Sequence, residues 1–173
     1  GVILGNAEDE FKSFVEKSGI PAAWTILGVS ALPTSHELNV GMVGMHGNYG
    51  PNLLTNECDL LVAIGMRFDD RVTGDPKTYA NQAKIIHLDI DPAEINKNIK
   101  VEVPIIGDCK ESLKLITEKI EKRSHEKWIS KFDDLMKIEF DKVINSDLNP
   151  SKKGLTMGES IIAINEQTNG EAI

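Results

Sequence analysis

The sequence predicts an α/β fold in which helices flank a parallel sheet. Three apolar runs, Leu60–Ile64, Lys84–Ile90 and Val103–Ile106, are continuous rather than alternating, which is typical of strands covered on both faces. Amphipathic helical patterns lie before and after these runs, as in Asn6–Lys17. Because strands that alternate with helices connect by right-handed crossovers, the pattern favours a parallel sheet.

In the first part of the chain we expect Val2–Leu4 to be the tail of a strand. Asn6 is placed to cap a helix that runs to Lys17, since its side chain can accept from free backbone N–H groups. The elements expected next are a buried strand at Ile20–Thr25, an irregular segment at Ile26–Val43 and a short helix at Asn52–Asn56.

In the last part, Asp108 is predicted to cap a helix, with Glu111 at the capping-box position. Ser124–Asn145 reads as a charged amphipathic helix and Asn145–Gly154 as a polar linker, and Thr156 opens a further helix. We therefore divide the chain into residues 1–122 as one domain, 123–154 as helix and linker, and 155–173 as the start of a following domain. The apolar start after Gly1 and the strand-like end at residues 171–173 predict a fragment of a longer chain.

Composition narrows the partners. The net charge is -8, from 27 acidic and 19 basic residues, whereas nucleic acid and anionic membranes require a basic footprint. Cys58 and Cys109 form no CxxC pair, which disfavours a zinc site and suits reduced cytoplasmic thiols. The sequence has no apolar run near the ~20 residues that span a bilayer. We expect a cytoplasmic protein with neither nucleic acid nor membrane as partner.

Ligands of open parallel sheets bind beyond the carboxyl ends of the strands, so the loops there carry the candidate site. Gly44–Gly47 brackets His46 with glycines that allow close approach to a ligand; a surface turn is the alternative. Gly65–Gly74 holds two arginines and two adjacent aspartates beside Phe68. Arginine suits phosphate, and the alternative is a set of self-neutralising surface ion pairs.

Two further loops carry acids. Asp89, at the end of its strand, is placed to accept from ribose hydroxyls, although turn chemistry also explains it. Asp108, next to Cys109, is explained by helix capping, although a helix N-terminus can also meet a ligand. The sequence contains neither GxGxxG after a strand nor GxxxxGK[ST], and His87 reads as a core histidine. The residues indicate a nucleotide-like cofactor without an identifiable catalytic group.

Four motifs in order, GMVGMHG (41–47), GMRFDDRVTG (65–74), KIIHLDIDPAEINKN (84–98) and IIGDC (105–109), resemble the acetolactate (acetohydroxyacid) synthase large subunit. RFDDRVTG is the most specific of them. The resemblance implies a Rossmann-like, FAD-binding central domain over about residues 1–121, and the start of the C-terminal domain from Thr156. Asn48–Pro51 and Ala22–Trp24 depart from the usual family pattern.

The resemblance also implies the chemistry. The full enzyme decarboxylates pyruvate and joins the two-carbon unit to a second 2-keto acid, at the start of branched-chain amino acid biosynthesis. Its thiamine diphosphate and Mg2+ are bound by the outer domains, outside this chain, so we expect the isolated fragment to be inactive. The implied partners are the remaining domains of the same chain, a second copy in a homo-oligomer, and a regulatory small subunit.

Carried over by matching position, Asp70 and Arg71 would face the substrate channel, with Met45 and His46 near the flavin ring. The residues that would meet the flavin nucleotide are Thr25, Ile26, Val43, Gly44, Met45, His46, Gly65, Met66, Arg67, Phe68, Asp69, Asp89, Ile90, Asp108 and Cys109.

Two other functions remain open. One is the middle domain of another thiamine-diphosphate enzyme, such as pyruvate oxidase or a 2-keto acid decarboxylase, against which RFDDRVTG speaks. The other is a non-catalytic nucleotide-binding domain, against which the second domain beginning at Thr156 speaks.

Overall fold

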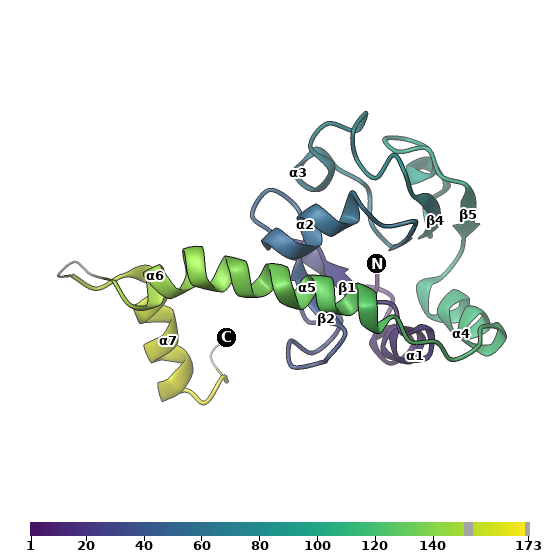
Figure 1. The fold of residues 1–173 in the computed structure, drawn as a ribbon. Coiled ribbons are helices and arrows are strands. Elements are labelled where there is room, and N and C mark those ends of the chain that lie inside the picture. Colours follow the sequence, from purple (N-terminus) through teal and green to yellow (C-terminus); the bar gives the residue numbers. More distant parts are fainter. Residues whose placement is uncertain (151–153, 172–173) are drawn as a thin grey trace.

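Five short strands form two parallel sheets in the computed structural model, which describes residues 1–150 and 154–171 (Figure 1). The larger sheet has the order β3-β4-β5 and the smaller one pairs β1 with β2. The strands are β1 (Ala22–Trp24), β2 (Asn39–Met42), β3 (Leu60–Ile64), β4 (Lys84–Asp89) and β5 (Val103–Ile106). Every pairing is parallel, with Leu60 opposite Lys84 and Ile86 opposite Val103. The predicted α/β class with parallel sheets flanked by helices is confirmed.

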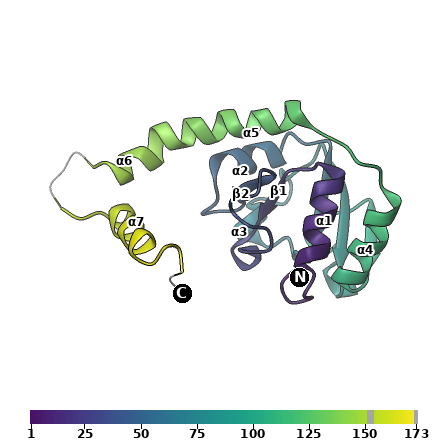
Figure 2. The same ribbon diagram turned by 90° about the horizontal axis from the view of Figure 1, so that it is seen from below.

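The helices separate or follow these strands. They are α1 (Glu8–Ser18), α2 (Tyr49–Thr55), α3 (Asp70–Thr73), α4 (Cys109–Lys119), α5 (Glu126–Glu139), α6 (Asn145–Leu148) and α7 (Met157–Gln167), with 3-10 turns η1 (Ile26–Gly28) and η2 (Pro92–Glu94) and a π-helical turn η3 (Phe140–Ile144). In both views α1 and α4 lie side by side (Figures 1 and 2). Lys17 joins them through a 2.7 Å hydrogen bond from Nζ to the Thr117 carbonyl oxygen.

The larger sheet is covered on both faces, which explains its continuous apolar runs. Val62 and Ile64 pack on the side of α1 and α4, together with the fully buried Leu113. Ala63 and Ile85 pack on the other side, in a cluster with Phe68 and Tyr79. Since side chains alternate along a strand, apolar residues are needed at consecutive positions.

The predicted strand at Val2–Leu4 is wrong, because that segment folds into a turn. The N–H groups of Gly5 and Ala7 bond to the carbonyl oxygens of Gly1 and Val2, at 2.9 and 3.0 Å. The predicted cap at Asn6 is also wrong. Asn6 has φ 47°, and α1 begins at Glu8 after Ala7, whose side chain is fully buried. The turn is what carries the chain into the helix with Ala7 facing the core.

The segment Ile26–Val43, expected to be irregular, contains η1 and the strand β2. Gly41 interrupts the apolar pattern of β2 and has φ 100°, and the strand pairs with β1 through a register shift. Short irregular pairing of this kind leaves little periodic signal. In the same segment His36 Nε2 lies 3.4 Å from Glu16 Oε1.

We call the strands together with α1–α4 the body of the molecule. The arm that follows it consists of α5, η3, α6 and α7. The helix predicted at Ser124–Asn145 is confirmed and continues through η3 and α6 to Leu148. In Figures 1 and 2 this rod runs past α2 and away from the sheets, and α7 turns back beside its far end. Residues 151–153 of the predicted linker and 172–173 of the strand expected at the end lie outside the described residues.

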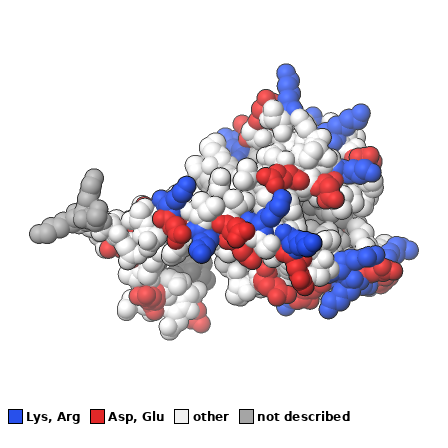
Figure 3. All heavy atoms as spheres, viewed as in Figure 1, with Lys and Arg blue, Asp and Glu red and all other residues white. Residues whose placement is uncertain are grey.

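Thr156 forms the predicted capping box. Its Oγ1 accepts from Glu159 N–H at 3.1 Å, and Glu159 Oε2 accepts from Thr156 N–H at 2.8 Å. In Figure 3 acidic and basic side chains are interspersed over the visible face of the body and of α5. None of the helices in the described parts of the chain is both long enough and apolar enough to cross a bilayer.

Candidate functional site

The loops after β3, β4 and β5 meet at one rim. Gly65 N–H donates to the Leu88 carbonyl oxygen at 2.7 Å, and Gly107 N–H donates to that of Asp89 at 3.0 Å. The backbone of Gly1 lies against Gly65, and Gly5 packs beside the Cys109 side chain. Because the strands are parallel, their carboxyl ends share this edge, where nucleotide ligands of such sheets bind.

The loop after β2 is tied to the same rim. Met45 N–H donates to the Arg71 carbonyl oxygen at 2.7 Å. A Cβ at Gly44 would lie 2.7 Å from that oxygen, and Gly44 has φ 110°, so only glycine fits there without strain. Asp70 and Arg71 line a groove of about 400 Å3 with Gly44 and Met45. The structure thus brings together two loops that are 26 residues apart in sequence (Met45 to Arg71).

Polar side chains from behind hold these loops. Asn52 Oδ1 accepts from Gly44 N–H and its Nδ2 donates to the Gly44 carbonyl oxygen, both at 2.8 Å. His87 Nε2 donates to the Met66 carbonyl oxygen at 2.8 Å, and Asn98 Nδ2 donates to that of Phe68 at 3.0 Å. Sequence reasoning missed Asn52 and Asn98, because an isolated asparagine gives no signal of what it holds.

His87 is buried as expected, with 0% exposure. Its Nε2 is bonded, but within residues 1–150 and 154–171 its Nδ1 has no hydrogen-bond partner. Phe68 packs edge-on against it, with ring centroids 4.9 Å apart. Phe68 has φ 53° and is 2% exposed, so its ring serves the core and only its backbone can meet a ligand at the rim.

The charged residues after β3 form two local ion pairs. Arg67 Nη2 lies 3.3 Å from Asp69 Oδ2, and Arg71 Nη1 lies 3.1 Å from Asp70 Oδ1. Asp69 also caps α3 by accepting from Arg71 N–H at 3.1 Å. In this structure each arginine is therefore paired with a neighbouring aspartate, which is the alternative of self-neutralising surface ion pairs. Both arginine side chains are exposed, at 64% and 75%, and exposed pairs are weak enough for a phosphate to replace the carboxylate.

The acids on the other strands are partly engaged. Asp89 is buried, and its Oδ1 accepts from Asp91 N–H at 2.9 Å while Oδ2 lies 3.8 Å from His87 Nε2. Asp108 caps α4 by accepting from Glu111 N–H at 3.0 Å, as predicted. Burial raises the pKa of the Cys109 thiol to about 11. A protonated thiol is a poor nucleophile.

Exposed apolar side chains surround the rim. Ile26 after β1, Met45 after β2 and Ile90 after β4 are 70%, 68% and 71% exposed. Ile106, at the end of β5, is 59% exposed and was not predicted as a site residue. Apolar side chains converging with a few polar groups are typical of sites for a flat, ring-containing ligand.

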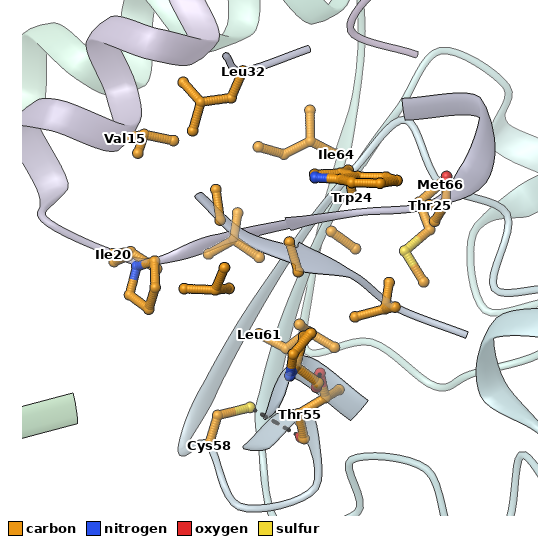
Figure 4. Close-up of a pocket in the computed structure, with 18 of the residues that line it drawn as sticks. Val15, Ile20, Trp24, Thr25, Leu32, Thr55, Cys58, Leu61, Ile64 and Met66 are labelled. Carbon is orange, nitrogen blue, oxygen red and sulfur yellow. Dashed lines mark hydrogen bonds between the residues drawn. The ribbon is translucent and has the colours of Figure 1, made fainter. Parts of the chain in front are cut away.

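An apolar cavity of about 190 Å3 reaches the rim from between the two sheets (Figure 4). Thr25, Val43, Gly65 and Met66 line it together with Trp24 and Ile64. In Figure 4 Thr25 and Met66 lie toward one end of the cavity, and Cys58 and Thr55 lie toward another.

Some predicted residues are not brought into contact. His46 is exposed, and across the described parts of the chain no hydrogen bond or ion pair joins it to Arg67 or Asp89. The part of the chain that the structure describes contains no cluster of histidines, cysteines and acids suited to a metal ion. The arrangement offers backbone, arginine and apolar contacts for binding a ligand.

Known proteins resemble this chain. The family model described as "Thiamine pyrophosphate enzyme, central domain" matches residues 1–116. A probable acetolactate synthase large subunit of Methanocaldococcus jannaschii is 44% identical over 80% of this chain and 24% of its own. The acetolactate synthase large subunit of Corynebacterium glutamicum is 52% identical over 68% of this chain and 19% of its own.

A third relative covers the whole chain. The acetolactate synthase large subunit of Lactococcus lactis is 37% identical over 100% of this chain and 29% of its own length. The chain thus spans less than a third of the length of each of these relatives. The resemblance predicted from the four motifs is confirmed.

Proposed function

The chain belongs to the family of thiamine pyrophosphate enzyme central domains, and we propose that it binds FAD as the central domain of an acetolactate synthase large subunit. The observation that carries this proposal is the tie between the loops after β2 and β3, through Met45 N–H and the Arg71 carbonyl oxygen. It holds two of the four family motifs, GMVGMHG and GMRFDDRVTG, at the rim where β4 and β5 also end.

The residues present fit a flavin nucleotide. Gly44 and Gly65, both with positive φ, let backbone approach a ligand closely. Arg67 presents an exposed donor fork suited to a diphosphate, and the exposed Ile26, Met45 and Ile90 suit the ring systems at its two ends. Bound FAD would supply a flat flavin ring; the chain's residues bind and orient it.

The activity of the whole enzyme is part of the proposal. The longer enzyme would decarboxylate pyruvate and condense the two-carbon unit with a second 2-keto acid, in the cytoplasm. Thiamine diphosphate and Mg2+ would be held by other domains, with a homo-oligomer and a regulatory small subunit as partners. Asp70 and Arg71, on the groove beside Met45, would face the substrate channel.

Titration of the purified chain with FAD, followed by quenching of flavin fluorescence, tests the cofactor. We expect saturable binding that Gly44→Ala weakens strongly, because the added Cβ would displace the loop from Arg71. Gly50→Ala is the matched control, since its Cβ would make only ordinary contact, at 3.5 Å from Leu135 Cβ. Absence of saturable binding, or equal loss in both variants, would contradict an FAD site at this rim.

Arg67 and the inactivity of the chain are tested separately. Arg67→Ala should weaken FAD binding about tenfold, as expected for one charge-assisted hydrogen bond, whereas Lys131→Ala on α5 should not. The chain supplied with pyruvate, FAD, thiamine diphosphate and Mg2+ should form no acetolactate. Turnover above the protein-free rate would refute the proposed division of labour between the domains.

A further inference from the structure

The helix α2 lies between the rim and the arm. It begins at Tyr49, just after the loop Val43–Gly47, and packs against α5, as Figures 1 and 2 both show. A Cβ at Gly50, in its first turn, would lie 3.5 Å from Leu135 Cβ and 3.7 Å from the Phe132 carbonyl oxygen. The start of α2 therefore contacts the arm and the rim loop at the same time.

Asn48, the residue before α2, is tied to the end of β2. Its N–H donates to the Met42 carbonyl oxygen at 2.8 Å, and its Oδ1 accepts from Met42 N–H at 2.9 Å. Met42 and Asn48 directly flank the loop Val43–Gly47, so these two hydrogen bonds close the base of the loop. The position of Asn48 therefore determines how the loop leaves the sheet.

The amide nitrogen of the same side chain contacts the arm. Asn48 Nδ2 donates to Oε2 of Glu139, the last residue of α5, at 3.3 Å. The two partners determine the orientation of the amide, because an N–H group needs an oxygen and a carboxylate needs a donor. The hydrogen bond is charge-assisted. One side chain thus bonds both the arm and the end of β2.

Helix capping does not account for this orientation. Asn48 occupies the N-cap position of α2, where an asparagine side chain ordinarily accepts from a free N–H of the first turn. Within the described residues its side chain makes no such capping bond. Gly41 leaves the necessary room, since a Cβ there would lie 2.5 Å from Asn48 Oδ1. The side chain therefore joins distant elements and does not stabilise its own helix.

Glu139 lies where the arm leaves the body. Phe132, Leu135 and Glu139 are spaced i, i+3 and i+7, and they share the face of α5 that meets α2. The next residue, Phe140, begins the π-helical turn η3 and is 45% exposed. Single π-helical turns are frequent at functional positions. The bond from Asn48 thus secures the last docked residue of α5.

The loop that Asn48 closes carries candidate flavin contacts. Asn52, one turn further along α2, bonds both the N–H and the carbonyl oxygen of Gly44. On its other side the loop is bonded through Met45 N–H to the Arg71 carbonyl oxygen. Because α2 and the residue before it hold the loop at Met42 and at Gly44, a displacement of this helix start would move the 68% exposed side chain of Met45.

We propose that Asn48 is a positioning residue through which the end of α5 sets the loop Val43–Gly47 at the rim. The bond to Glu139 holds the Asn48 amide against Met42, and the loop is placed from there. The consequence for the cofactor rests on the proposed FAD site. The positioning of the loop does not depend on it.

A charge-reversal cycle tests the positioning. Asn48→Asp keeps an acceptor for Met42 N–H but sets a second carboxylate against Glu139, and Glu139→Lys sets a cation against the amide donor of Asn48. Each single substitution should speed amide hydrogen exchange at Met42, Gly44 and Met45 about fivefold, as expected for the loss of one hydrogen bond. The double variant, in which opposite charges face each other, should return to within about twofold of the parent rates.

Glu57→Ala is the matched control. It removes another contact between the body and α5, the 3.2 Å ion pair with Lys131, which does not involve the loop. Exchange in the loop should keep its parent rate in this control, and exchange at Gly65, at the same rim, should keep it in every variant. Parent rates in both single variants, no recovery in the double variant, or an equal change in the control would overturn the proposal.

Titration with FAD separates this inference from the proposed function. Both single variants should bind FAD severalfold more weakly than the parent chain, and the double variant and Glu57→Ala should bind like the parent. If the parent does not bind FAD while the exchange cycle gives the expected rates, the proposed function fails and the positioning role of Asn48 stands. Faster exchange in the single variants with undiminished FAD binding would overturn the link from the loop to the cofactor.

Discussion

The helices α4 and α7 have the same length of 11 residues and similar starts, yet different surroundings. Asp108 caps the first and the Thr156 capping box opens the second. In α4, Leu113 is fully buried against α1 and the larger sheet, whereas in α7 Ile161 and Ile164 are 60% and 54% exposed. The comparison shows that a local sequence specifies where a helix starts, while its burial depends on the elements that surround it.

The largest expected effect comes from Leu113, which lies on the buried face of α4. Leu113→Ala leaves a cavity between α1, α4 and the sheet, and should lower the free energy of unfolding by about 2–5 kcal/mol. Ile164→Ala, the matched change on α7, should shift it by less than about 0.5 kcal/mol. Urea unfolding followed by far-UV circular dichroism measures both. Similar losses in the two variants would mean that α7 packs against the body in solution.

The arm meets the body where α5 packs against α2. Phe132 is 8% exposed, contacts Trp128 edge-on at 5.7 Å and lies next to Gly50. Because only one side of α5 is covered, we expect Phe132→Ala to cost about 2 kcal/mol, less than a fully enclosed Phe. Limited proteolysis should then cut faster near residue 124, and Phe140→Ala, at a 45% exposed site, should not change that rate. Unchanged cleavage after Phe132→Ala would show that the arm is held by other contacts.

His87 tests whether the core of the body shapes its rim. His87→Leu leaves the part-buried Met66 carbonyl oxygen without its donor and should cost about 1–2 kcal/mol of stability and weaken FAD binding. His87→Gln, whose amide can still donate, should recover part of the binding. If His87→Leu loses stability but binds FAD like the parent chain, the loop Gly65–Asp69 does not depend on this hydrogen bond.

The sequence predicted well those elements whose signal is local. The strands β3, β4 and β5 and the caps at Asp108 and Thr156 follow from apolar runs and side-chain chemistry. The turn at residues 2–6 and the strand β2 were missed. Each is defined by contacts with distant residues, such as Gly65 for the first and β1 for the second.

The sequence predicted which loops form the candidate site, but it did not predict what each side chain does there. Parallel topology alone brings the ends of β3, β4 and β5 to one rim. The inward orientation of Phe68 depends on its positive φ and on His87, and no periodic pattern encodes either. The same applies to Asn52, which holds Gly44 from another element.

The smallest expected effect separates the arm from the body most cleanly. Thr156→Ala removes the hydroxyl that accepts from Glu159 N–H, and the loss of such a cap costs about 1 kcal/mol. Because no α7 residue is buried among those described, that cost should appear as lower helicity of α7 at an unchanged Tm of the body.

Thr168→Ala, at the other end of α7, is the control and should leave the start of the helix intact. Backbone chemical shifts at residues 157–160 report the helix and thermal unfolding reports the body. A parallel fall in the Tm of the body would mean that arm and body unfold as one cooperative unit. If the arm unfolded independently, loss of the cap would not destabilise the sheets.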